Sequence, residues 1–187
     1  MKKKLVERKD GLAVNSRTGE PEPERQAGED DFGACYEAAL HYIEYRPRSG
    51  AEVLSHLQYK RKYRAESVSR ALEKLKELQL IDDRAFSETW ARDRVKYRHK
   101  SSLMIRRELM QKGVEGKIIE SVTGDIDDEA NALRAGMSKA RLLRNLEYPE
   151  FYKRLASYLT RKGYGADQVH GVVRRLWDSK TGDTTGK

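Results

Sequence analysis

The sequence predicts an all-α protein of three tandem three-helix, helix-turn-helix-like repeats in an elongated curved array, preceded by a flexible N-terminal segment. Three observations support this fold class. Helix-forming residues dominate the middle of the chain, and only four prolines occur in 187 residues. Apolar residues recur there at steps of three and four. A block of about fifty residues is repeated along the chain.

The two ends of the chain are polar. Residues 15–31 are rich in Pro, Gly and Glu, so they bury too little surface to offset chain entropy. We predict that residues 1–31 form an N-terminal extension, either flexible or containing a hairpin at Asp10-Gly11, and that residues 179–187 form a disordered tail. No segment resembles a signal peptide or a membrane span, so we expect a cytoplasmic protein without membrane contact.

The internal repeat divides the rest of the chain into three units, at residues 32–82, 83–124 and 125–178. A constant offset of 50 aligns Lys112-Gly113 of the second unit with Lys162-Gly163 of the third. The first unit aligns with the second at an offset of 52 and needs one inserted residue near Lys60–Tyr63. Because a unit of this size buries its apolar face poorly by itself, we expect neighbouring units to pack together.

Residues typical of helix ends agree with this division. Asp82-Asp83 and Asp127-Asp128 each precede an apolar-periodic run, which makes them candidates for helix N-caps. Gly113 and Gly163 each end such a run, where a left-handed helix cap favours glycine. Pro149 suits the first turn of a helix.

No catalytic or cofactor motif is present. The chain lacks a phosphate-binding loop, a His-Glu-x-x-His motif and a nucleophile elbow. Its four histidines are isolated, and Cys35, the only cysteine, excludes an intrachain disulfide and a thiolate zinc site. Asp125, Asp127 and Asp128 lack the glycine and glutamate of a calcium loop. We therefore expect no enzyme activity, no metal and no cofactor.

Positive charge is the remaining candidate for function. The net charge is +8, and residues 1–31, with seven basic and eight acidic residues, leave +9 to the remainder. Basic residues interleaved with aromatic ones suggest a polyanionic partner, although over a third of the chain is charged and each could belong to an ordinary solvated face. The candidate partner- and DNA-binding residues are Arg46, Arg48, Lys60, Arg61, Lys62, Arg64, Arg92, Arg94, Lys96, Arg98, Lys100, Arg106, Arg107, Arg161, Lys162, Arg174 and Arg175.

Three segments carry a resemblance to a known family. They are Arg46-Pro47-Arg48-Ser49 followed by Glu52, Leu80-Ile81-Asp82-Asp83 followed by Phe86, Trp90 and Arg94, and the block of Ile105, Leu109 and Lys112-Gly113. Together they resemble the RecX family of recombination regulators over roughly residues 34–177. Three turns depart from the family, which often has glycine where this chain has Gln79, Lys60–Tyr63 and His99-Lys100-Ser101. These departures affect turns and leave the helical faces intact.

The resemblance implies three tandem three-helix modules in an elongated crescent. It implies a monomer that binds the RecA recombinase filament on single-stranded DNA, lodged in the groove of the filament. RecA ATP hydrolysis and strand exchange would fall, and filaments would stop extending, so recombination and DNA repair would be regulated by binding alone. The implied partners are RecA and, more weakly, single- or double-stranded DNA.

Two other interpretations stay open. The chain could be a tandem helix-turn-helix protein that acts directly on DNA, with the last helix of each unit in a major groove. Residues 65–79 argue mildly against this, because their three basic residues are balanced by three glutamates. It could also be a helical scaffold that binds another protein on its concave face. For Trp90, four residues after Phe86, we expect core packing.

Overall fold

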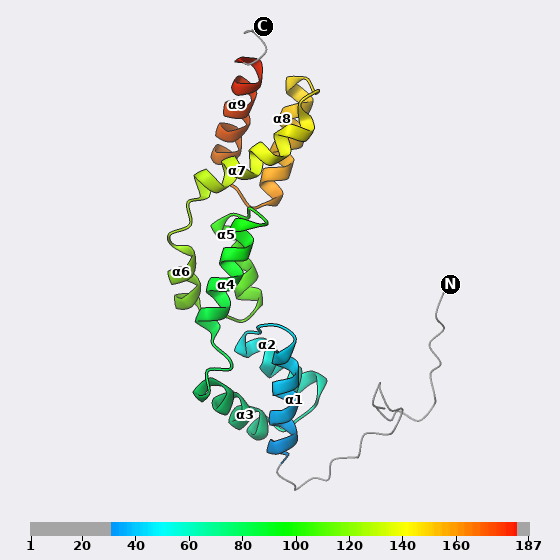
Figure 1. The fold of residues 1–187 in the computed structure, drawn as a ribbon, viewed down its shortest axis with the longest axis vertical. Helices are drawn as coiled ribbons and strands as arrows, with labels where there is room; N and C mark the ends of the chain where they lie inside the picture. Colours follow the sequence, from blue (N-terminus) through cyan, green and yellow to red (C-terminus); the bar gives the residue numbers. More distant parts are fainter. Residues whose placement is uncertain (1–30, 183–187) are drawn as a thin grey trace, which may run out of the picture.

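A computed structural model describes residues 31–182, which form an elongated, gently curved column of helices (Figure 1). Within these residues there is no strand, so the all-α fold class is confirmed. No helix in this range has the length and apolar character that a bilayer crossing requires. The prediction of a flexible or hairpin extension falls, except for Asp31, outside the described residues.

The helices group into three modules of three. The first module contains α1 (Phe32–Glu44), α2 (Gly50–Ser55) and α3 (Ala65–Glu77). The second contains α4 (Asp83–Lys96), α5 (Ser102–Gln111) and α6 (Gly116–Thr123). The third contains α7 (Asp128–Ala140) with a 3-10 turn (Arg141–Leu143), α8 (Tyr148–Arg161) and α9 (Ala166–Gly182). In every module the first helix packs against the third.

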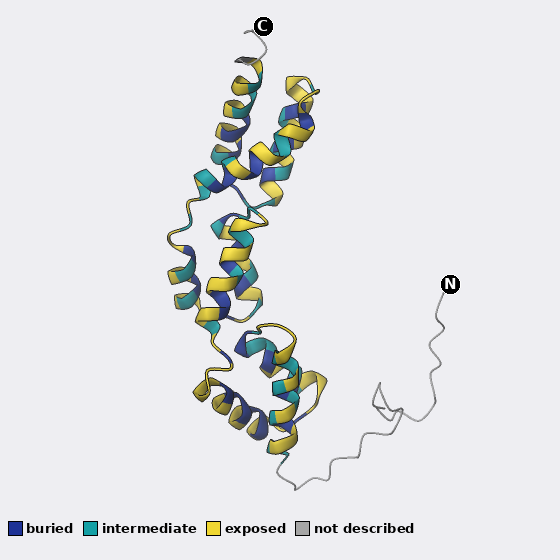
Figure 2. Ribbon diagram, in the orientation of Figure 1, coloured by how far each residue is buried: buried dark blue, intermediate teal, exposed yellow. Residues whose placement is uncertain are grey.

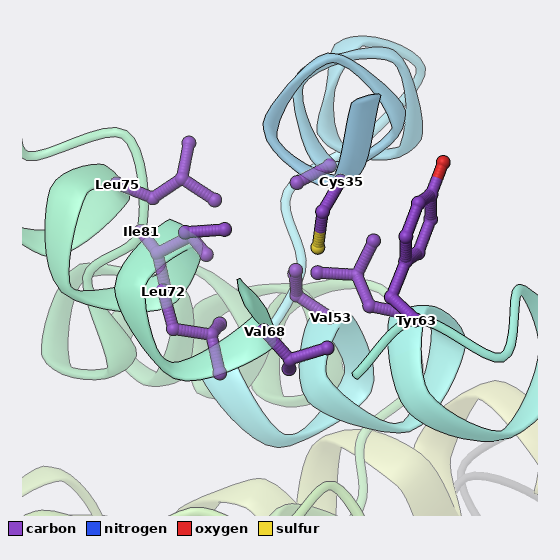
Figure 3. Close-up of a cluster of buried hydrophobic side chains, with 10 residues drawn as sticks. Cys35, Val53, Tyr63, Val68, Leu72, Leu75 and Ile81 are labelled. Carbon is purple, nitrogen blue, oxygen red and sulfur yellow. The ribbon is translucent and has the colours of Figure 1, made fainter. Parts of the chain in front are cut away.

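Each module has its own hydrophobic core, and buried residues line the inward faces of the helices (Figure 2). In the first module Cys35, Val53 and Val68, one from each helix, point toward one another (Figure 3). Leu109 of α5 and Leu159 of α8, which the repeat aligns, are both fully buried. The column is therefore held by three small cores rather than one thick core.

The first module absorbs the single-residue insertion that its alignment with the second unit requires. Helix α2 continues into a π-helical turn, His56–Lys60, in which Arg61 N donates to His56 O at 3.0 Å. A π turn accommodates one extra residue within a helix. The insertion expected near Lys60–Tyr63 is thus taken up just before that segment.

The expected helix ends are present. Asp82 and Asp127 are N-caps whose carboxylates accept backbone N–H groups of the following turn. Gly113 and Gly163 end α5 and α8 with φ of 71° and 95°. Pro149 lies in the first turn of α8. These four caps and the proline confirm the sequence-based assignments.

The prediction of a disordered tail from residue 179 is wrong for residues 179–182, which belong to α9. Lys180 Nζ donates to the main-chain oxygen of Leu146 at 2.6 Å and lies 4.1 Å from the centroid of the Trp177 ring. The hydrogen bond to the segment before α8, together with the contact to Trp177 within α9, stabilises the last turns of α9, although their sequence is polar.

The three turns that depart from the family keep a left-handed backbone. Lys62, Gln79 and His99 have φ of 58°, 54° and 46°. This conformation costs a residue with a side chain roughly 1–2 kcal/mol. The helices on either side thus keep their directions, and each turn bears a strain that glycine would remove.

Candidate functional site

At each contact between neighbouring modules, the later module accepts hydrogen bonds from the start of the middle helix of the earlier module. Ser49, the N-cap of α2, donates through Oγ to the main-chain oxygen of Lys112 at the end of α5, at 2.6 Å. The N–H of Gly50 donates to Oδ1 of Asp83, the first residue of α4, at 2.8 Å. The first turn of a helix leaves N–H groups without intrahelical acceptors. In this contact, the first junction, module 2 supplies one of those acceptors.

The second junction repeats this pattern one module further along. The N–H of Ser101, the N-cap of α5, donates to the main-chain oxygen of Lys162 at the end of α8, at 3.0 Å. Ser102 donates to the carboxylate of Asp128, the first residue of α7, through its N–H at 2.8 Å and its hydroxyl at 2.6 Å. Modules 2 and 3 are therefore joined through equivalent acceptors to those between modules 1 and 2, although the Ser101 N–H replaces the Ser49 hydroxyl as the donor to the lysine main-chain oxygen.

The two Asp-Asp pairs thus have divided roles. Asp82 and Asp127 cap their own helices, whereas Asp83 and Asp128 accept hydrogen bonds from the preceding module. The expectation that either aspartate of a pair could be the cap is corrected, because the second aspartate lies inside its helix. The second aspartate of each pair instead connects modules.

Both junctions require glycine for a second reason besides φ. A Cβ on Gly113 would lie 2.3 Å from Cβ of Ala51, and a Cβ on Gly163 would lie 2.4 Å from Oγ of Ser101. The equivalent turn of module 1 carries Lys62, and among the described residues no module precedes it. The turn can therefore hold a side chain where the later modules cannot.

Glu52 joins the two sides of the first junction. Its Oε1 accepts Arg46 Nη2 at 3.0 Å and Lys112 Nζ at 2.7 Å. Burial alone would raise the pKa of Glu52, but the hydrogen bonds from Arg46 and Lys112, with that from the Ser49 N–H, lower it to about 2. The candidate Arg46 thus has an internal counter-ion at neutral pH.

Glu108 of α5 does the same inside module 2. Its Oε2 accepts Trp90 Nε1 at 2.9 Å and Arg94 Nε at 2.8 Å, and its Oε1 accepts Lys100 Nζ. Burial would raise the pKa of Glu108, but the hydrogen bonds from these three side chains lower it. Arg94 and Lys100, both predicted to contact a partner, here link α4, the α4–α5 loop and α5.

Trp90 is not a fully buried core residue. Its ring lies 5.6 Å from that of Phe86, while the Arg94 guanidinium lies 3.7 Å from its centroid. It is half-buried and packs against the edge of the module 2 core. The expectation of core packing therefore holds for only part of the ring.

Other candidates also have partners within the chain. The guanidinium of Arg48 lies 4.1 Å from the centroid of the Tyr42 ring. Arg106 Nε donates to Thr123 Oγ1 at 2.7 Å, which ties α5 to α6. Lys162 Nζ is half-buried at the second junction and donates to the main-chain oxygen of Arg98.

The remaining candidates lie on the surface and are spread over all three modules. They occur at the end of the π helix and in the turn after it, on α4 and the loop after it, on α5, at the end of α8 and on α9. The exposed candidates are Lys60, Arg61, Lys62, Arg64, Arg92, Lys96, Arg98, Arg107, Arg161, Arg174 and Arg175. The structure therefore does not gather them into one compact site.

His56 has a packing role. The rings of His56 and Tyr42 stack at 3.8 Å, and burial together with the nearby Arg61, Lys60 and Arg48 lowers the pKa of His56. In the part of the chain that the structure describes, no three His, Cys, Asp or Glu side chains are placed to hold a metal ion.

Reasoning from the sequence missed the residues that build the junctions. Glu52 at the first junction and Glu108 inside module 2 were not among the candidates, because the charge count considered only the surplus of basic residues, and Lys112 was not among them either. One signal was available: the offset of 52 aligns Ser49 with Ser101, and both are N-caps. A serine at the same place in two repeats indicates a shared helix start.

Comparisons with known proteins agree with this modular architecture. The family model for the second three-helix domain of RecX matches residues 82–122. Regulatory protein RecX of Clostridium botulinum (strain Alaska E43 / Type E3) is 33% identical over 172 residues, which cover 89% of this chain and 79% of that protein. Its counterpart from Streptomyces coelicolor is 30% identical over 177 residues, 93% of this chain and 92% of that protein. The crystal structure of RecX from Lactobacillus salivarius has the same fold, with a TM-score of 0.67 at 24% identity over 79% of this chain and 97% of that one. The chain belongs to the RecX family of regulatory proteins.

Proposed function

We propose that this protein regulates the RecA recombinase by binding its filament on single-stranded DNA. In this proposal the protein lowers RecA ATP hydrolysis and strand exchange and stops the filament from extending. The similarity to regulatory RecX proteins over almost the whole chain is the observation that carries it. Regulation needs binding alone, so no catalytic residue is assigned.

The shape of the molecule supports this proposal. The column of modules is long and gently curved, and each junction ties a helix N-terminus to the next module by hydrogen bonds of 2.6–3.0 Å. Exposed basic residues occur on all three modules. A stiff, extended, basic body can contact several neighbouring units of a nucleoprotein filament at once, and its affinity then grows with the number of contacts.

We assign different roles to the candidate basic residues. Arg46, Arg94 and Lys100 are bound to carboxylates within the chain, so their loss should first affect the fold. Arg92, Lys96 and the other exposed candidates are the ones proposed to contact the filament. In the filament these residues would contact either acidic side chains of RecA or the phosphates of the DNA.

The test is the DNA-dependent ATPase of RecA from the same organism, measured while this protein is titrated in. We expect inhibition by the wild-type protein. The triple variant Arg92→Glu, Lys96→Glu, Arg107→Glu should inhibit more weakly at unchanged helical circular dichroism. The control variant is Lys74→Glu, Lys76→Glu, Lys117→Glu. It changes the net charge by the same amount at residues outside the set proposed to contact the filament, and it should inhibit like wild type. An ATPase rate unaffected by excess wild-type protein would refute the proposal.

A tandem helix-turn-helix function has less support. Helix α6 has eight residues with one lysine, Lys117, and one glutamate, Glu120, which is a poor composition for a helix that reads a major groove. On α3, Lys74 pairs with Glu77 at 3.5 Å. A defined footprint on duplex DNA in the absence of RecA would favour this alternative over the filament proposal.

A further inference from the structure

One difference between the two junctions changes their charge. Glu52 and Met104 each lie three residues after the N-cap serine of their helix. At the first junction the Lys112 ammonium pairs with Glu52 at 2.7 Å. At the second, Met104 offers no charge, and Lys162 Nζ donates to the main-chain oxygen of Arg98. No carboxylate among residues 31–182 lies within ion-pair distance of Lys162. The charge of Lys112 is thus neutralised by a carboxylate, whereas the charge of the equivalent Lys162 is not.

Positive charge accumulates around Lys162. Burial lowers the pKa of Lys162, and Lys100 and Arg98 lower it further, as expected where cations crowd together. Lys100 has Glu108 as its counter-ion, but Arg98 is exposed and has no ion pair within the described residues. A fourth cation, Lys139, reaches the neighbouring Tyr158 ring. The second junction therefore has the Asp128 carboxylate but, among the described residues, no carboxylate that pairs with Lys162.

Aromatic side chains accompany these cations. Lys162 Nζ and Lys139 Nζ lie 5.2 Å and 5.8 Å from the centroid of the half-buried Tyr158 ring. In the loop before α5, Tyr97 is 67% exposed and has Lys96 Nζ 5.1 Å from its centroid. Sites for single-stranded nucleic acid combine cations for the backbone with aromatic faces for the bases. This combination favours a phosphodiester over a protein carboxylate.

We propose that the second junction binds a backbone phosphate of single-stranded DNA between Lys162 and Arg98, with the exposed Tyr97 ring available for a base. This inference rests on the proposed function in one respect only, namely that the partner includes single-stranded DNA. The phosphate occupies, in charge terms, the place that Glu52 fills at the first junction. The two junctions therefore differ in function: the first is neutralised within the chain, and the second is completed by the ligand.

The decisive variant is Met104→Glu. It places a carboxylate opposite Lys162, as Glu52 stands opposite Lys112, and it creates the Ser-x-x-Glu pattern of a capping box, so it should not unfold the helix. Binding of a short fluorescein-labelled oligothymidylate to the full chain, without RecA, is followed by anisotropy over a range of salt concentrations. Each phosphate contact in a single strand contributes about 0.7 to the slope of log K against log salt. We expect the slope to become shallower by about 0.7 and the affinity near ~0.1 M salt to fall about fivefold.

Matched variants separate this site from a general charge effect. Lys162→Met should weaken binding as Met104→Glu does, whereas Lys112→Met, the same change at the first junction, and Met104→Gln should bind like wild type. The proposal is overturned if wild type does not bind the oligonucleotide, if Met104→Glu binds like wild type, or if Lys112→Met loses as much as Lys162→Met. It is also overturned if Met104→Glu loses only RecA inhibition, because Lys162 would then meet a protein acid. Wild type that binds the oligonucleotide through Lys162 but leaves the RecA ATPase unchanged would refute the proposed function alone.

Discussion

Gly113→Ala tests how closely modules 1 and 2 approach each other. Gly113 has φ of 71°, and the added Cβ would stand 2.3 Å from Cβ of Ala51. An ordinary contact begins near 3.4 Å, so the modules would have to separate by about 1 Å. That movement would stretch the 2.6 Å hydrogen bond from Ser49 Oγ to the Lys112 main-chain oxygen.

Two contributions give the expected magnitude. The left-handed backbone costs alanine roughly 1–2 kcal/mol. Overpacking of a close contact typically costs about 1–3 kcal/mol. We therefore expect Gly113→Ala to lower the free energy of unfolding by about 2–5 kcal/mol, measured by urea denaturation followed by circular dichroism.

A double variant isolates the steric contribution. Ala51→Gly removes the atom at 2.3 Å and leaves the Ala51 Cα at 3.9 Å, while weakening α2 by about 0.5–1 kcal/mol. The pair Gly113→Ala, Ala51→Gly should be more stable than the sum of the single changes by about 1–3 kcal/mol. Gly116→Ala is the control, since nothing lies within 4 Å of its added Cβ. Additive single changes would refute the close approach at the first junction.

Four further outcomes are expected, each measured as a change in stability. Leu109→Ala should lower the free energy of unfolding by about 2–5 kcal/mol, because Leu109 is fully buried. Gln79→Gly should raise the free energy of unfolding by about 1 kcal/mol, because glycine relieves the strain of the left-handed turn. Gly171→Ala should also raise it by about 1 kcal/mol, because Gly171 lies inside α9 with open space around it. The folded-state pKa values of Glu52 and Glu108 are lowered, so their stabilisation is present above the ordinary glutamate pKa of 4.5 and is lost as the pH falls through the lowered pKa values, about 2 in the case of Glu52. Melting temperatures from neutral pH downward check this last outcome, and a rise in stability on acidification would contradict it.

Local patterns predicted most of the architecture. The helices, the caps at Asp82 and Asp127 and the glycine turns at Gly113 and Gly163 depend on residues a few positions apart, which the sequence displays directly. The repeat alignment also indicated where the first module holds an extra residue, although not that a π turn would absorb it. The polar end of α9 was predicted less well, because the contact of Lys180 with a residue 34 positions earlier decides it.

The candidate site was harder to predict, because its chemistry depends on contacts between helices. Counting charges placed Arg94 and Lys100 among the residues for a partner. Their partner proved to be Glu108, 14 and 8 residues away, on a helix whose orientation the count does not contain. The role of Asp83 was missed for the same reason, since its hydrogen bond crosses from one module to another.

The shared helix caps have a consequence for synthesis on the ribosome. Chains emerge N-terminus first and fold module by module. The start of α2 is completed by Asp83 and the start of α5 by Asp128, so each module reaches its final contacts only after the next one has begun to emerge. Helix α8 has no later module among the described residues, and Pro149 in its first turn has no N–H that needs an acceptor. The last middle helix to emerge during translation, α8, therefore has one fewer backbone N–H group that needs a hydrogen-bond acceptor at its start.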